Sequence, residues 1–185
     1  MKKPMIIKWL DIFIIEDQDA PIWVIFEITL FVRIGKFFAS CLNKNTRIKI
    51  LKQLKMYDTS IDTNGNLLSS TIFALKSLRN SVAHNNIIFD ARFKDRKVST
   101  ILKRWTENET GINNITLYSL IDYIIVICCI LKRISFSKER SKTLLRKYEE
   151  ETKKLQNNVT PEIYNIIIQQ NVPEKIQGLK EYINR

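Results

Sequence analysis

The scarcity of chain-turning residues limits the folds open to this sequence more than any other feature. The 185 residues include only four glycines and four prolines. A β-sandwich or β-barrel needs many tight turns, and these two residue types supply most of them. Hydrophobic residues make up 45 % of the chain, which is enough to form a buried core. We therefore expect an all-α fold in which long helices are joined by a few loops.

Helical periodicity and capping residues divide the chain into segments. A short apolar helix or extended arm is expected at 4–15. Helices are expected at 22–42, 47–55, 67–84, 98–105, 116–134, 137–157, 161–170 and from Pro173 to about Asn184, with polar loops at 58–66 and 107–114. The expected organisation is a core at 1–135 and a C-terminal helical extension at 136–185, or one domain throughout.

The net charge favours a polyanionic partner. Thirty Lys and Arg against 19 Asp and Glu leave a formal charge of +11. Such an excess suits nucleic acid or an acidic membrane surface. The apolar stretches at 22–32 and 121–131 are shorter than the ~20 residues that span a bilayer. They contain Glu27 and Asp122, and a buried carboxylate needs a partner. We expect buried helices, no membrane association and a cytoplasmic location.

Cysteine and histidine usage gives little support for a metal site. Cys128 and Cys129 are adjacent within an apolar run, as core residues of a protein from a reducing compartment would be. No zinc-binding spacing is present, and a single histidine cannot build a His-rich centre. No metal and no cofactor are expected.

The segment with the most specific chemistry ends at His84, the only histidine. It lies four residues after Asn80 and five after Arg79, at the end of the helix expected at 67–84. At roughly 100° per residue, Asn80 and His84 share one face, and the long Arg79 side chain reaches the same helix end. The buried face of this helix is expected to consist of Leu68, Ile72, Leu75, Leu78 and Val82.

These three residue types suit RNA cleavage without a metal. A histidine titrates near neutrality and can take the proton from a ribose 2′-OH. An arginine can hold the phosphate and stabilise its extra charge, while the amide of Asn80 orients either group. One histidine per chain is too few for separate base and acid, but a symmetric dimer supplies two. In the alternative interpretation, His84 is a helix cap and Arg79 an ordinary surface residue.

A family resemblance bears on this choice. The segment Arg79–His84 matches the R-x4-6-H motif of HEPN domains (higher eukaryotes and prokaryotes nucleotide-binding). The wider stretch resembles the abortive infection (Abi) family of bacterial phage-defence proteins, through the segments at 21–27, 75–85 and 88–93. The resemblance implies an HEPN-like helical bundle, here with additional C-terminal helices. It also implies dimerisation through the motif helices and metal-independent endoribonuclease activity in abortive infection or a toxin–antitoxin system, restrained by a small antitoxin RNA or a partner protein.

The resemblance also implies roles for single residues, namely Arg79 and His84 as catalytic and Asn80 as supporting. From the residues themselves, we expect Glu27 to orient Arg79 or Asn80, or else to face solvent. Cations interleaved with Phe89 and Phe93 follow the motif and suit single-stranded RNA. The expected RNA-binding residues are Lys76, Arg92, Lys94, Arg96 and Lys97.

Two other functions stay open on the sequence. One is a non-catalytic RNA-binding module of a defence ribonucleoprotein complex, in which Arg79 and His84 hold RNA. The other is a helical protein–protein interaction component of a defence complex. The basic side of the charged helix at 137–157 is either a solvated face or an extension of the RNA-binding surface.

Overall fold

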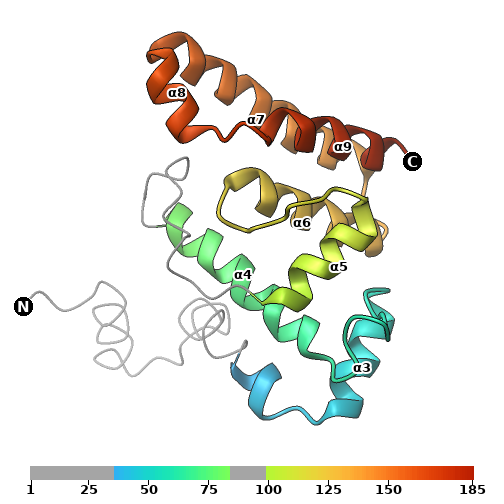
Figure 1. The fold of residues 1–185 in the computed structure, drawn as a ribbon. Coiled ribbons are helices and arrows are strands. Elements are labelled where there is room, and N and C mark those ends of the chain that lie inside the picture. Colours follow the sequence, from blue (N-terminus) through green and yellow to red (C-terminus); the bar gives the residue numbers. More distant parts are fainter. Residues whose placement is uncertain (1–35, 84–98) are drawn as a thin grey trace, which may run out of the picture.

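The described part of the chain is helical throughout. The structure is a computed structural model that describes residues 36–83 and 99–185, with the side chains of 36–79 and 99–185. Within these ranges no strand occurs, and the all-α expectation is confirmed (Figure 1). The labelled helices are α3 (Lys44–Gln53), α4 (Asn66–Ala83), α5 (Thr100–Thr110), α6 (Leu120–Arg133), α7 (Lys138–Asn158), α8 (Pro161–Ile167) and α9 (Val172–Asn184).

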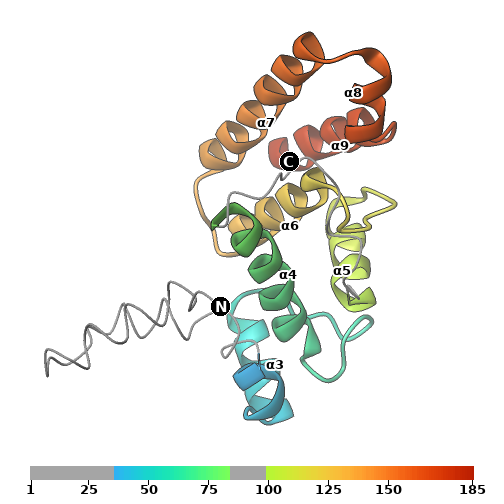
Figure 2. The same ribbon diagram turned by 90° about the vertical axis from the view of Figure 1, so that its left-hand side faces the viewer.

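Helix α6 is the central helix of the described fold. It contacts α4, α5, α7 and α9. Its apolar sequence leaves eight of its 14 residues buried, including both Cys128 and Cys129, so the expected core role of these cysteines is confirmed. Figures 1 and 2 show α7, α8 and α9 on one side of α6, and α3 with the start of α4 at the far end of the molecule. One hydrophobic cluster includes residues on both sides of Ser135. The division at 135 stays a prediction.

The C-terminal helices are amphipathic and bury one face each. Along α7, the buried Ser141, Leu145, Tyr148 and Thr152 follow one another at spacings of four, three and four residues. This face packs on α6 and α9, while the charged side is exposed. Helix α8 starts at Pro161 after Thr160, as expected, but ends three residues early, at Ile167.

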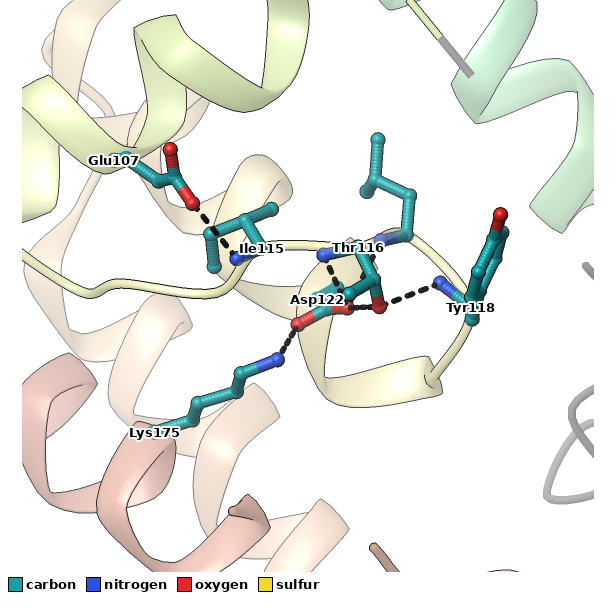
Figure 3. Close-up of polar contacts among 7 residues, drawn as sticks. Glu107, Ile115, Thr116, Tyr118, Asp122 and Lys175 are labelled. Carbon is teal, nitrogen blue, oxygen red and sulfur yellow. Dashed lines mark hydrogen bonds and ion pairs between the residues drawn. The ribbon is translucent and has the colours of Figure 1, made fainter. Parts of the chain in front are cut away.

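Helix α6 starts later than the sequence suggests. The sequence predicts a start at Thr116, but the helix begins at Leu120. The carboxylate of the buried Asp122 explains the difference (Figure 3). Its Oδ2 accepts hydrogen bonds from the backbone N–H of Thr116 (3.1 Å) and Leu117 (2.9 Å) and from the Thr116 hydroxyl (2.8 Å). These bonds hold 116–117 in a loop, with Leu117 at a φ of 60°.

Helix α5 extends into the segment expected to be a loop. It was expected at 98–105 but runs from Thr100 to Thr110, so the expectation of a loop from 107 onward is wrong for its first four residues. The buried hydroxyls of Thr106 and Thr110 donate to the carbonyl oxygens one turn earlier, each at 2.8 Å, so both polar side chains are satisfied within the helix. Gly111, with a φ of 76°, then ends it.

The bounds of α3 also differ by a few residues from the expected ones. Helix α3 was expected at 47–55 and runs from Lys44 to Gln53, because the Asn43 side chain accepts the N–H of Thr46 at 2.9 Å and caps it. The helix has one buried and one exposed side. Leu51 is buried, and the side chains of Lys49, Lys52 and Lys55 are exposed.

Among the described residues, no helix combines the length and the apolar character needed to cross a membrane.

Candidate functional site

The helix that carries Arg79 and Asn80 is fixed firmly at its start. The buried Asp62 accepts the N–H of Leu67 at 2.6 Å and that of Asn64 at 3.0 Å. These bonds satisfy one donor in the first turn of α4 and one in the loop that precedes the helix. Between them, Gly65 has a φ of 74°, and a Cβ there would lie 2.7 Å from the Cβ of Arg47 on α3. The loop at 58–66, which contains Asn64 and Gly65, therefore brings the start of α4 into close contact with α3.

The buried face of α4 is rotated from the expected one. Leu68 is buried as expected, but Ile72, Leu75 and Leu78 are half-buried, and the side chain of Val82 lies outside the described residues. The buried side chains are instead Leu67, Leu68, Ser69, Thr71, Ala74 and Ser77. Small residues let α4 approach its neighbours closely. Their hydroxyls stay satisfied because Thr71 and Ser77 donate to carbonyl oxygens four residues earlier, at 2.8 and 3.1 Å.

This packing leaves the candidate residues of α4 exposed to different degrees. Arg79 is exposed and Lys76 half-buried, and Asn80 lies in the last turn of the helix. Lys76 and Arg79 are three residues apart, so they are neighbours on the helix surface. Phe73 lies three residues before Lys76 and is 37 % exposed. We call Phe73, Lys76 and Arg79 the α4 ridge.

The remaining candidate residues fall on segments that are not described. These residues are Glu27, His84, Arg92, Lys94, Arg96 and Lys97. His84 directly follows Ala83, the last residue of α4 as described. The expectation that Glu27 orients Arg79 or Asn80 also lies outside the described residues. Of the expected site, the structure thus places Lys76, Arg79 and the backbone of Asn80 on one helix. In Figure 1, the end of this helix lies away from α3, at the left of the described fold.

A second polar region, which the sequence did not reveal, lies on another part of the molecule. It is a pocket of about 400 Å³ between the segment after α3, helix α5 and the end of α6. Its walls include Lys55, Asp58, Trp105, Asn108, Glu109 and Arg133. These residues are scattered over nearly 80 positions of the sequence, and no local pattern links them.

The acidic and thiol side chains do not form a metal-binding group. Within residues 36–83 and 99–185, no set of three or more His, Cys, Asp or Glu side chains lies close enough together to hold an ion. The two buried cysteines are protonated at neutral pH, because burial raises the pKa of Cys128 to about 11 and that of Cys129 further still.

Comparison with known proteins gives one match. No curated protein and no solved structure matches this chain. Residues 8–90 match the model of a protein family described as Abi-like protein. The matched range is less than half of the chain, but it includes all of α3 and α4 and the whole Arg79–His84 segment. The match supports the resemblance to the Abi family that the sequence indicated.

Proposed function

We propose that this protein acts on RNA in bacterial phage defence, as a metal-independent endoribonuclease of an abortive infection or toxin–antitoxin system. The observation that carries the proposal is the Abi-like match, whose range contains the Arg79–His84 motif. Helix α4 adds support, because its packing leaves Arg79 exposed in the turns that lead to His84. The HEPN assignment, the RNase activity and the dimer are parts of this proposal.

The proposed reaction is an internal phosphoryl transfer. His84 of one subunit takes the proton of a ribose 2′-OH, and the 2′ oxygen forms a bond to the adjacent phosphorus. The bond from phosphorus to the 5′ oxygen breaks, which leaves a 2′,3′-cyclic phosphate. His84 of the second subunit gives a proton to the departing 5′ oxygen, so no net proton is consumed. Arg79 stabilises the charge that develops on the phosphate, and Asn80 positions one of these groups.

Electrostatic attraction supports RNA as the partner. The chain carries a formal charge of +11. On α4, Lys76 and Arg79 are neighbours on the helix surface and can both attract a phosphate backbone. Arg92, Lys94, Arg96 and Lys97 extend the proposed RNA-binding surface beyond the motif.

The test is RNA cleavage by the purified protein in EDTA, with the cleavage products analysed for 2′,3′-cyclic phosphate ends. We expect His84→Ala to lower the rate roughly 10²- to 10⁴-fold, the usual contribution of a general acid or base. Arg79→Ala should lower it by a similar order, because a charge-stabilising group is lost. Arg104→Ala removes an exposed arginine of α5 and serves as the matched control with unchanged activity.

A non-catalytic RNA-binding module is the second candidate. The α4 ridge favours it specifically, because an exposed aromatic ring next to two neighbouring cations can bind RNA with no chemistry at all. In that case the wild-type protein binds RNA and no cyclic ends form. Cleavage that is lost in His84→Ala excludes this candidate. Cleavage that persists in both His84→Ala and Arg79→Ala overturns the endoribonuclease proposal.

A further inference from the structure

The connection between α6 and α7 carries two apolar side chains at the surface. We call residues 134–136 the α6–α7 turn. Ile134 is 44 % exposed and Phe136 is 43 % exposed. Figure 2 shows this connection at the edge of the described fold. In Figure 1, the start of α7 lies beside the C-terminal end of α9, at the right, whereas α4 ends at the left. The turn is therefore remote from the motif at the end of α4.

The backbone of the α6–α7 turn is fixed by hydrogen bonds that close the end of α6. The N–H of Ser135 donates to the carbonyl oxygen of Lys132 at 3.0 Å. The N–H of Phe136 donates to that of Leu131 at 2.8 Å. This is the Schellman arrangement, in which the residue after the cap has a left-handed backbone, and here Ser135 takes that place with a φ of 59°. The two apolar residues on either side of Ser135 are thus held in set positions.

Cations from three parts of the chain meet at this turn. Lys55, in the segment after α3, places its Nζ 3.4 Å from the Ser135 hydroxyl. A cavity of about 200 Å³ lies between the ends of α6 and α9 and the start of α7, and Phe136 forms part of its wall. Three cations also line it, namely Lys132, Lys138 and Arg185. No Asp or Glu is among the described residues that line this cavity.

Much of this positive charge is not neutralised within the described fold. Lys132 Nζ and Lys138 Nζ each donate to a backbone carbonyl oxygen of α9 at 2.8 Å. A carbonyl oxygen carries no net charge, so both ammonium charges remain. Between positions 132 and 142 the sequence has five cations and one carboxylate, Glu139, which is paired with Lys142 at 2.9 Å. The α6–α7 turn therefore combines exposed apolar groups with a local excess of positive charge.

This combination selects a partner that is both anionic and apolar. A bilayer of anionic lipids offers phosphates at its surface and acyl chains just beneath them. We propose that the α6–α7 turn docks on an anionic membrane surface, with Ile134 and Phe136 at the acyl boundary and the surrounding cations on the lipid phosphates. Single-stranded RNA fits this surface less well. The guanidinium of Arg140 already lies over the Phe136 ring, 4.7 Å from its centroid, and Ile134 has no ring on which a base can stack.

Such a contact departs from the sequence expectation of no membrane association. That expectation rests on apolar stretches too short to span a bilayer, whereas a contact with the membrane surface needs no spanning segment. The proposed docking uses neither Arg79, Asn80 nor His84. It therefore does not depend on the proposed RNA cleavage.

Vesicle flotation with the purified full chain tests the proposal. The vesicles are pure phosphatidylcholine, or an equal mixture of phosphatidylcholine and phosphatidylglycerol. We expect the protein to float with the anionic vesicles only, and high salt to weaken this binding because it screens the charges. Phe136→Trp reports on the turn itself. The fluorescence that this variant adds to the wild-type spectrum should shift to shorter wavelength on anionic vesicles, because the new ring leaves water.

A matched pair of charge variants locates the contact on α7. Lys138→Gln/Arg140→Gln should lower the affinity for anionic vesicles roughly 10- to 30-fold, because each cation near the surface attracts the lipids. Lys147→Gln/Lys153→Gln makes the same charge change at exposed positions of the same helix. Lys147 lies roughly 10 Å beyond Arg140 along the axis, more than the Debye length of about 8 Å. This control should therefore bind nearly as well as the wild type.

A second pair tests the apolar groups. Ile134→Ser/Phe136→Ser should lower vesicle affinity about tenfold or more, because two side chains no longer gain from leaving water. Ile163→Ser/Ile166→Ser replaces two apolar residues of α8 that are 46 % and 81 % exposed, and it should leave the affinity unchanged. Circular dichroism would verify that each variant is folded.

Four results would overturn the inference. The first is no binding of the wild type to anionic vesicles. The second is an equal loss of affinity in the two charge variants, which would mean that the overall charge alone attracts the protein. The third is unchanged affinity in Ile134→Ser/Phe136→Ser. The fourth is single-stranded RNA binding that falls in Lys138→Gln/Arg140→Gln without any vesicle binding, which would make the turn an RNA contact. His84→Ala should bind vesicles normally, so a failure of the docking and a failure of the proposed RNA cleavage give different results.

Discussion

At the scale of single residues, Asp122 shows how a charge can be accommodated in an apolar helix. Its side chain is fully buried and so is that of Lys175 on α9, whose Nζ lies 2.6 Å from Asp122 Oδ1. The other carboxylate oxygen binds the loop at 116–117 (Figure 3). The sequence predicted that a buried Asp122 needs a partner, and this is confirmed. It could not predict which lysine, because Lys175 is 53 residues away.

A double-mutant cycle tests the coupling between Asp122 and Lys175. Lys175→Met leaves a buried carboxylate without its counter-ion and should lower the free energy of unfolding by about 3–5 kcal/mol. Asp122→Asn keeps the shape of the side chain but leaves the ammonium unpaired, with a loss of similar order. In the double variant neither charge is left alone, so its loss should be clearly smaller than the sum of the two single losses. Urea unfolding measures all four proteins, and strictly additive losses would contradict the coupling.

The positions of the candidate site residues could be predicted where they depend on the local sequence pattern. The periodicity of the apolar residues placed Arg79 and Asn80 near the end of a helix, and the described part of α4 agrees. That pattern could not give the rotation of the helix, because Thr71 and Ser77 bury hydroxyls that its own backbone satisfies. The polar pocket could not be predicted at all, since only tertiary packing brings Lys55, Glu109 and Arg133 together.

At the scale of elements, helices with a clear amphipathic period were found from sequence, whereas the junction between α5 and α6 was not. Helices α7 and α9 match the expected ranges closely, since each carries an amphipathic repeat over several turns. The junction at 111–119 depends instead on carboxylates of the two helices that flank it. Glu107 accepts the N–H of Ile115 at 3.0 Å, and Asp122 accepts two more from the loop. Such bonds decide where α5 ends and α6 begins.

The packing of α7 on the core predicts a loss of stability in alkali. Burial raises the pKa of Tyr148 on this helix from 10.0 to about 12. Unfolding restores the ordinary pKa, so this tyrosine contributes its full stability below pH 10 and loses it as the pH rises toward 12. Tyr148→Phe cannot ionise, so the difference in unfolding free energy between this variant and the wild type should shift by on the order of 2 kcal/mol in favour of the variant between pH 9 and 12. Urea unfolding at several pH values measures it, and a constant difference would contradict the argument.

At the scale of the whole molecule, the exposed side of α4 is the surface to which the proposed function leads. The helix packs on α3, α5 and α6 and leaves Phe73 and Arg79 of the α4 ridge exposed. At roughly 100° per residue, Phe73 and Asn80 lie within about 20° of each other around the helix. In the proposed dimer, two such helices face one another, because each subunit contributes a single histidine to the reaction. The exposed Phe73 would then be covered by the second subunit.

Replacing Phe73 tests this arrangement. An aspartate at position 73 would place a charge in the proposed interface, where desolvation without a partner is strongly unfavourable. We expect Phe73→Asp to shift the protein from dimer to monomer in sedimentation equilibrium, at concentrations where the wild type is dimeric. RNA cleavage should fall with the fraction of dimer, because each monomer lacks the second histidine. Ile166→Asp is the matched control, since Ile166 on α8 is 81 % exposed and should leave both mass and activity unchanged. If Phe73→Asp stays dimeric and active, α4 does not face its symmetry mate. If the wild type is monomeric while it cleaves RNA, His84 of one chain must serve as both base and acid.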